Sequence, residues 1–249
     1  MWDARTFDFT GKTVLVTGAA SGIGAAMAEE FHRQGATLKL ADRNEPELTV
    51  RAQQLGPNVE CHIYDQANTA SVLGLAEWAG TVDVLMNNAG IVAFGEIQSH
   101  SPELLTTVIN TNLTGPIMLA NAIATGMLAR RSGVIVNTTS QLAFCGAPQR
   151  AVYASAKAGL AQFTKSVAAE WAPHGVRVLA IAPGRTLTAL NSARLSDPAV
   201  REAALGGIPL GRFGSATEIA KIALFLASDA AEYVVGHSLI ADGGYVIAN

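Results

Sequence analysis

Short runs of aliphatic and β-branched residues alternate with helix-like patterns along almost the whole chain. The first run, residues 12–17 (KTVLVT), ends at glycines and is followed by apolar residues at helical spacing, among them Ile23, Met27 and Phe31. Further runs occupy residues 37–41, 59–64, 82–86, 134–137, 176–181 and 238–241. Such alternation predicts parallel strands joined by right-handed helical crossovers. We therefore expect a three-layer, doubly wound α/β fold with a seven-stranded parallel sheet.

Two longer segments, residues 104–129 and 151–172, have helical periodicity, and the first is interrupted near Gly115 and Pro116. No Pro/Ser-rich linker, block of charge or internal repeat divides the chain. Residues 1–249 are therefore expected to form a single domain.

The formal net charge is −3, with acidic and basic residues interspersed. This balance argues against nucleic acid or an anionic membrane as a partner and favours a small soluble ligand. Charged residues make up only 15% of the chain against a usual ~25%, whereas hydrophobic residues make up 49%. Either some apolar surface faces other subunits, or abundant alanine and glycine dilute the charge.

Targeting and metal signals are not found in the sequence. The first residues lack the apolar core of a signal peptide, and residues 115–129 are too short to span a bilayer, so we expect a cytoplasmic protein. Two cysteines and five scattered histidines form neither a disulfide framework nor a ligand pattern, so we expect no metal.

Three glycines, Gly18, Gly22 and Gly24, form a G-x-x-x-G-x-G motif between the first strand and the first helix. Without Cβ atoms the turn can fold tightly and approach a pyrophosphate at the helix amino end. Asp42, at the end of the second strand, is positioned to bind the hydroxyls of an adenosine ribose. A carboxylate there would repel a 2′-phosphate, which favours NAD over NADP, although Arg43 could bind such a phosphate.

Several other polar residues are expected at the carboxyl ends of the strands, where ligands of doubly wound folds collect. Asp65, after the third strand, is interpreted either as a cap for the adenine amino group or as a turn residue. The complete set at this edge is Ser21, Asp42, Asp65, Asn87, Asn112, Ser140 and Thr188.

Tyr153 and Lys157 lie four residues apart in a predicted helix, and Ser140 precedes Tyr153 by thirteen residues. Residues four apart share one helix face, so the Lys157 ammonium can lie beside the Tyr153 oxygen. Lowering a phenol pKa from ~10 to ~7 requires about 4 kcal/mol. One cation ~4 Å away at an effective dielectric of ~20 supplies about that much. We therefore expect Lys157 by itself to lower the pKa of Tyr153 to about 7, a value close to neutrality.

Together these motifs resemble the short-chain dehydrogenase/reductase family, in its single-domain form with a Rossmann fold. The resemblance runs from Lys12 to Gly244. It rests on residues 17–24, 87–90, Asn112, Ser140, Tyr153 with Lys157, Pro183-Gly184 with Thr188, and 242–244.

The resemblance implies a role for each catalytic residue. Tyr153 would be the general acid or base, and Ser140 would hydrogen-bond the reacting oxygen, although neighbouring Thr139 is a second hydroxyl there. Lys157 would lower the Tyr153 pKa and bind the nicotinamide ribose. Asn112 would hold a water that links Lys157 to solvent, or would simply mark a helix kink.

The resemblance also implies the remaining cofactor contacts. The implied set is Gly18, Ser21, Gly22, Ile23, Gly24, Asp42, Arg43, Asp65, Asn88, Ala89, Gly90, Tyr153, Lys157, Pro183, Gly184, Thr186 and Thr188. One departure stands out, because Arg185-Thr186 replace the apolar pair usual after Pro183-Gly184. Arg185 would then be either a specificity element or a solvated side chain.

The expected lid segment, residues 187–207, has few bulky apolar residues, which favours a small polar substrate such as a sugar, polyol or hydroxy acid. Gln141 and Cys145 are expected to line the pocket. Arg150, Arg185 and Arg194 could bind an acid group bidentately, or they could be solvated at the surface.

The predicted activity is NAD(H)-dependent interconversion of a secondary alcohol and a ketone. An NADP(H)-dependent carbonyl or 3-oxoacyl reductase, a non-catalytic NADH sensor and a structural oligomer component are the alternatives. The resemblance also implies a homotetramer that pairs its tyrosine-bearing helices and docks residues 236–249.

Overall fold

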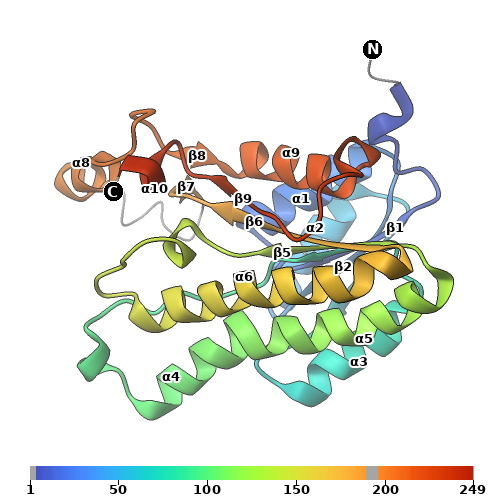
Figure 1. The fold of residues 1–249 in the computed structure, drawn as a ribbon, viewed down its shortest axis with the longest axis horizontal. Helices are drawn as coiled ribbons and strands as arrows, with labels where there is room; N and C mark the ends of the chain where they lie inside the picture. The colour runs from blue at the N-terminus through green and yellow to red at the C-terminus, as the bar shows by residue number, and fades with distance from the viewer. Residues whose placement is uncertain (1–3, 189–195, 249) are drawn as a thin grey trace.

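The computed structural model describes residues 4–188 and 196–248 of the chain. Its main sheet has seven parallel strands in the order β3-β2-β1-β4-β5-β6-β9 (Figure 1). These strands are β1 (Thr13–Thr17), β2 (Thr37–Asp42), β3 (Val59–Ile63), β4 (Val84–Asn87), β5 (Gly133–Thr138), β6 (Val176–Pro183) and β9 (Ser238–Ala241). The predicted fold class and the seven strands are confirmed, with ends that differ by at most two residues.

Helices connect these strands and cover both faces of the sheet. The α-helices are α1 (Gly22–Arg33), α2 (Glu45–Leu55), α3 (Thr69–Ala79), α4 (Pro102–Ile109), α5 (Gly115–Arg130), α6 (Ala151–Trp171), α8 (Pro198–Leu205), α9 (Ala216–Ala227) and α10 (Tyr245–Ala248). Short 3-10 turns are η1 (Ala4–Phe7), η2 (Ile97–Ser99), η4 (Gln141–Ala143), η5 (Ala172–His174) and η7 (Asp229–Ala231).

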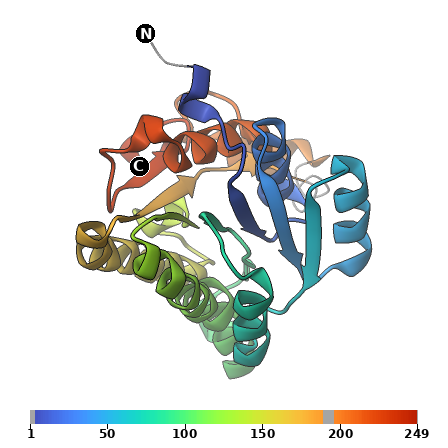
Figure 2. The same ribbon diagram turned by 90° about the vertical axis from the view of Figure 1, so that its right-hand side faces the viewer.

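Two apolar cores lie on opposite faces of the sheet. On one face, Val14 and Val16 of β1 pack with α1, α2 and α9. On the other face, Leu15 packs with α3, α5 and α6. Figure 2 shows α9 in red on one side of the sheet and α5 and α6, in green and yellow, on the other. The strands are buried on both faces, which explains their continuous rather than alternating apolar sequences.

The chain reverses the direction of its strand order between β1 and β4. β1 continues to β2 on one side, whereas β4 continues to β5 and β6 on the other. The register pairs Thr17 with Ala41 and Asn87 with Asn137, so the strands end nearly level. Ligands of such sheets bind in the crevice at this topological switch point.

Two features differ from the sequence-based expectations. The helix break lies before Gly115, because Asn110–Thr114 form a π-helical turn, η3, and Pro116 sits in the first turn of α5, where proline is tolerated. A parallel two-stranded ribbon, β7 (Thr186–Leu187) with β8 (Gly214–Ser215), was not expected.

Candidate active site

The turn after β1 carries the first cofactor residues and is tied to the turn after β4. Gly18 has φ +67°, and a Cβ there would lie 2.9 Å from the Ala89 Cα. The buried Thr17 hydroxyl accepts hydrogen bonds from the backbone N–H of Asn88 (2.9 Å) and of Ala89 (3.0 Å). Thr17 thus fixes the two turns to each other, a role that sequence reasoning missed because threonine is unremarkable at a strand end.

The turn after β1 and the start of α1, residues 18–24, form a glycine-rich turn, which we call the glycine cradle. Ser21 is the exposed N-cap residue, and its hydroxyl makes no capping hydrogen bond. A Cβ on Gly24 would lie 2.0 Å from the Gly18 carbonyl oxygen, so α1 packs against the turn only with glycine here. Gly22, next to the half-buried Ile23, has φ +58° and faces the Thr188 side chain.

Asp42 ends β2 beside this cradle. Its carboxylate accepts hydrogen bonds from the backbone N–H of Ala20 (3.1 Å) and of Asn44 (3.0 Å). These bonds hold the half-buried carboxylate against the glycine turn, while the neighbouring Arg43 is exposed. Asp65 is exposed and accepts a hydrogen bond from the Ala67 N–H at 2.9 Å, so it makes at least the turn contact considered from sequence.

The segment after β4 contacts both the glycine turn after β1 and the side chains of Asn112 and Lys157. The Asn88 side chain donates to the Thr17 carbonyl oxygen at 3.0 Å. A Cβ on the exposed Gly90 would lie 2.7 Å from Asn112 Oδ1 and 3.4 Å from Lys157 Nζ. Gly90 therefore allows the Asn112 and Lys157 side chains to pack closely against the segment after β4.

Gln66, another residue that sequence reasoning missed, holds the segment after β4 in place through hydrogen bonds. Its buried amide donates to the carbonyl oxygens of Ala89 (2.8 Å) and Thr111, and it accepts a hydrogen bond from the Tyr64 hydroxyl. These contacts link the turn after β4 to the π-helical turn, two segments that are not neighbours in sequence.

Asn112 lies within the π-helical turn and is fully buried. Its side-chain amide donates to the carbonyl oxygens of Ile91 (2.9 Å) and Val108 (3.0 Å), and its oxygen accepts from the Ile91 N–H (3.2 Å). The side chain thus fixes the loop after β4 to the irregular helix, which is the kink position considered from sequence.

Ser140 and Tyr153 meet at the carboxyl end of β5. A hydrogen bond from the Ser140 side chain reaches the Tyr153 phenol, and α6 presents that phenol from its first turn. The Thr139 hydroxyl instead donates to the Ile181 carbonyl oxygen at 3.0 Å, inside the sheet. Of the two hydroxyls weighed from sequence, Ser140 is therefore the one at the site.

Lys157 is 3% exposed, and its ammonium donates to the Thr138 carbonyl oxygen at 2.7 Å, 5.9 Å from the Tyr153 ring centre. Burial lowers the pKa of Lys157 to about 8. Burial also raises the pKa of Tyr153, while Ser140 and the charge of Arg150 oppose that rise. The prediction that Lys157 alone brings the Tyr153 pKa to neutrality is therefore wrong, because burial of the phenol outweighs the contributions of the chain's own charges.

The turn after β6 completes this side of the site. Pro183 ends β6, and the buried Thr186 hydroxyl donates to the Gly184 carbonyl oxygen at 3.1 Å. The Arg185 guanidinium donates to the carbonyl oxygens of Ala203 (3.4 Å) and Ala204, at the end of α8. Arg185 thus tethers α8 to the turn, a contact that neither alternative from sequence included.

The other substrate residues differ in their surroundings. Arg150 lies over the Phe94 ring, 5.0 Å from its centre, near enough to Tyr153 for its charge to affect the phenol. Cys145 is half-buried and contacts the Gln141 carbonyl oxygen, while the Gln141 side chain is buried. Arg194 lies outside the described residues.

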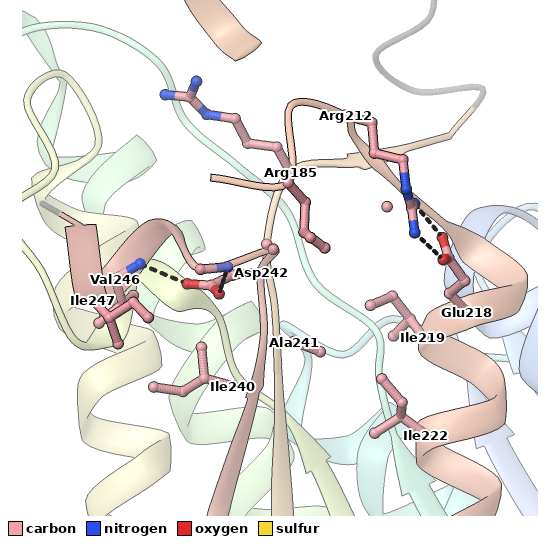
Figure 3. A pocket seen from close by; sticks show the side chains of 15 residues that line it. Arg185, Arg212, Glu218, Ile219, Ile222, Ile240, Ala241, Asp242, Val246 and Ile247 are labelled. Atoms are coloured by element: carbon pink, nitrogen blue, oxygen red, sulfur yellow. Dashed lines mark hydrogen bonds and ion pairs between the residues drawn. The ribbon is translucent and has the colours of Figure 1, made fainter. Parts of the chain in front are cut away.

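A groove of about 430 Å³ adjoins Gly184 on the side of the carboxyl-terminal segment. Figure 3 shows its apolar lining of Ile219, Ile222 and Ile240, with the ion pair of Arg212 and Glu218 at its rim. The polar groups that surround Tyr153 do not line this groove.

Neither a metal cluster nor a membrane span is found within residues 4–188 and 196–248. No three His, Cys, Asp or Glu side chains gather there in a way that could hold a metal ion. In the same residues no helix combines the length and apolar character that crossing a bilayer requires.

The residues at the switch point fit a bound dinucleotide. The glycine cradle would hold the pyrophosphate, since a Cβ on Gly24 would collide with the turn, and Asp42 would hold a ribose. Lys157 approaches Gly90 closely, and Tyr153 lies one turn before it on α6. A doubly wound sheet with a glycine turn of this kind is typical of nicotinamide-dependent oxidoreductases, and in this chain a serine, a tyrosine and a lysine lie together at the carboxyl end of β5.

Comparison with known proteins identifies the particular family. The family model described as "Enoyl-(Acyl carrier protein) reductase" matches residues 18–246. The chain belongs to the short-chain dehydrogenase/reductase family, whose dehydrogenases act on CH–OH groups, and the family predicted from sequence is confirmed.

The relatives have different substrates. The chain is 38% identical to D-threitol dehydrogenase of Mycolicibacterium smegmatis, over 97% of this chain and 96% of the relative. It is 38% identical to a 3-oxoacyl-[acyl-carrier-protein] reductase of Thermotoga maritima (95% and 98% covered). It is also 36% identical to an NAD-dependent glycerol dehydrogenase of Listeria innocua (98% and 97% covered).

Several similar solved structures contain NADP, and one of them serves as an example. It is that of a putative NAD(P)-dependent gluconate 5-dehydrogenase from Beutenbergia cavernae with bound NADP. Its TM-score is 0.93 at 36% identity, with 97% of this chain and 99% of that chain covered.

Proposed function

We propose that this protein is an NAD(H)-dependent dehydrogenase that interconverts a secondary alcohol and a ketone on a small polar substrate, namely a sugar, polyol or hydroxy acid. The observation that carries the proposal is the contact between the Ser140 side chain and the Tyr153 phenol, with Lys157 buried on the same helix. The names of the threitol and glycerol dehydrogenases support the substrate class.

In the proposed mechanism, the hydroxyls of Ser140 and Tyr153 hydrogen-bond the reacting oxygen, where charge develops. Tyr153 gives its proton to that oxygen in ketone reduction and removes it in alcohol oxidation. Lys157, held by the Thr138 carbonyl, would bind the nicotinamide ribose and keep a positive charge on the same helix. The bound cofactor supplies the hydride chemistry and, when oxidised, a positive charge of its own.

The raised pKa of Tyr153 suits the reductive direction directly, because the phenol retains the proton it must donate. For oxidation the phenolate is needed, and the charges of Arg150 and Lys157 would contribute to its stability. The buried neutral phenol thus implies that oxidation gains more than reduction from a rise in pH.

Asp42 supports NAD as the preferred cofactor. Its carboxylate is held at the glycine turn by two backbone N–H groups, where a 2′-phosphate would meet a like charge. The alternative is an NADP(H)-dependent carbonyl or 3-oxoacyl reductase. The exposed Arg43 beside Asp42, the 3-oxoacyl reductase relative and the NADP-bound similar structure favour that alternative.

A non-catalytic NADH sensor or a purely structural subunit would have no need for Ser140, Tyr153 and Lys157 together, and this chain has all three. A scan of polyols, sugars, hydroxy acids and their ketones with both nicotinamide cofactors tests the proposed activity. In that scan Tyr153→Phe should lower turnover to less than a few per cent of wild type, an order-of-magnitude threshold, with NADH binding nearly unchanged. A variant that keeps its rate would remove Tyr153 from the mechanism.

We further propose a homotetramer, in which the apolar groove of Figure 3 faces a second copy. Ile247, which lines that groove, is 90% exposed, and Leu210 beside it is 65% exposed. Against an interface along α6, several of the apolar residues that suggested it, including Leu160, Ala161 and Val167, are buried within the chain itself. Sedimentation equilibrium of the purified protein tests the stoichiometry, and a monomer would contradict it.

A further inference from the structure

The side-chain amide of Gln141 is buried beside the catalytic serine with an unused hydrogen-bond acceptor. Gln141 directly follows Ser140 and is 3% exposed. Its Oε1 has no hydrogen-bond partner among the residues that the structure describes. Buried side-chain amides in folded proteins are nearly always paired, so an orphan such as this one requires an explanation.

The position of the amide places it at the ligand-binding edge of the sheet. A Cβ on Gly184 would lie 2.8 Å from Gln141 Oε1 and 2.5 Å from the Asp242 Cα. The amide oxygen therefore packs against the turn after β6, where any side chain at position 184 would collide with it. This turn and Ser140 both follow adjacent strands, β6 and β5, at their carboxyl ends.

The local backbone does not use this oxygen. The Gln141 main-chain carbonyl accepts hydrogen bonds from the Phe144 N–H (3.0 Å) and the Cys145 thiol (3.6 Å). The Gly184 N–H, on the same turn, is already bonded to the Ala241 carbonyl oxygen at 2.9 Å. The Gln141 side-chain acceptor is thus left without a partner among the described residues.

We propose that Gln141 is a specificity-determining residue that binds a second hydroxyl of the substrate, on the carbon next to the one that reacts. The proposal rests on the proposed function. A hydroxyl can donate to Oε1 and also accept from the amide N–H group, so it matches both ends of the side chain. A polyol or sugar has such a hydroxyl, whereas the carbons next to the ketone of a 3-oxoacyl thioester have none.

A preference among substrates follows from this hydrogen bonding between Gln141 and the second hydroxyl. A site that hydrogen-bonds a substrate hydroxyl discriminates strongly against an analogue that lacks it, because the buried polar group then stays unpaired. Gln141 would therefore favour vicinal diols over simple secondary alcohols, and it would do so without taking part in proton transfer.

The test compares substrate pairs that differ by one hydroxyl, butane-2,3-diol with butan-2-ol and cyclohexane-1,2-diol with cyclohexanol. For the wild-type enzyme we expect kcat/KM to be about 10- to 100-fold higher for each diol. In Gln141→Met, which keeps the volume and removes the hydrogen bonds, this preference should disappear through loss of diol activity. The kcat/KM for the simple alcohols should stay within about twofold. Gln54→Met, at an exposed glutamine of α2, is the matched control.

The outcomes separate the two proposals. If the wild-type enzyme turns over no polyol and no simple alcohol, the proposed function fails and the role of Gln141 with it. If both members of each pair react equally well, the proposed function stands and the role of Gln141 is refuted. An equal loss on both substrates in Gln141→Met, or weaker NADH binding in a fluorescence titration, would also refute it by indicating a structural or cofactor contact. The wild-type comparison needs no variant, so it tests the proposed role of Gln141 even if Gln141→Met does not fold.

Discussion

Replacing Lys157 with methionine should stabilise the protein near neutral pH while it destroys the proposed active site. Burial lowers the pKa of Lys157 from its ordinary 10.5 to about 8. At about 1.4 kcal/mol per pH unit, keeping this amine charged in the fold costs about 3 kcal/mol at pH 7. Methionine has a similar length and no charge, so Lys157→Met avoids this cost. It loses only the hydrogen bond to Thr138, which contributes about 1 kcal/mol.

The sign of the pH dependence follows from the two pKa values. Below about pH 8 the amine is charged in both folded and unfolded protein, and the cost of burial is fully present. Between pH 8 and 10.5 the unfolded chain holds more protons than the fold, so wild-type stability rises relative to the variant. The free-energy difference between the two proteins should therefore shrink by about 2 to 3 kcal/mol from about pH 7 to about pH 10.

Urea unfolding at fixed protein concentration, followed by tryptophan fluorescence at several pH values, measures this difference directly. Lys165→Met, at an exposed lysine of the same helix, controls for the loss of a positive charge. A difference between wild type and Lys157→Met that stays constant with pH, or a variant that is less stable at pH 7, would contradict the reasoning. The Lys157 ammonium would then be compensated by contacts other than the Thr138 carbonyl.

Two further predictions concern the cofactor side of the site. Asp42→Ala should weaken NAD binding by about 10- to 150-fold, since a charge-assisted hydrogen bond contributes about 1.5–3 kcal/mol, and should relatively favour NADP. Fluorescence titration with both reduced cofactors measures this, and an unchanged preference would remove Asp42 from the ribose site. Thr17→Val should lower the free energy of unfolding by about 1–3 kcal/mol, because the N–H groups of Asn88 and Ala89 lose their acceptor. Urea unfolding measures this with Thr81→Val, at an exposed threonine, as the control; equal stability of the two variants would argue against the link.

The local chemistry of the site was predictable where a residue type has few alternative uses. Glycine at positive φ, as at Gly18 and Gly22, follows from the lack of a Cβ, and the motif spacing places both at a strand-to-helix turn. The i, i+4 spacing predicted that Tyr153 and Lys157 share one face of a helix, because residues four apart are neighbours on a helix surface. Sequence favoured Ser140 over the neighbouring Thr139 hydroxyl, and the structure showed that Thr139 is engaged in a backbone contact.

The electrostatics of the site were predicted less well. Spacing predicted that Lys157 lies near Tyr153, but the balance of charge against desolvation depends on how deeply both groups are buried. Arg150, considered from sequence as a substrate ligand or a solvated side chain, contributes to the Tyr153 pKa because folding places its charge nearby. Arg185 contacts the carbonyl groups of a helix that follows it by many residues, which no local pattern indicates.

The succession of strands and helices along the chain, the glycine cradle and the positions of Ser140, Tyr153 and Lys157 on their elements were determined by sequence alone, because apolar periodicity and residue geometry act over a few neighbouring residues. Only the tertiary structure decided which polar groups are paired and which are left with an open acceptor. The Thr17 and Gln66 links and the unpaired Gln141 amide each depend on segments far apart in the chain. Hydrogen bonding and burial are properties of the packed chain, so they are settled only when distant segments meet.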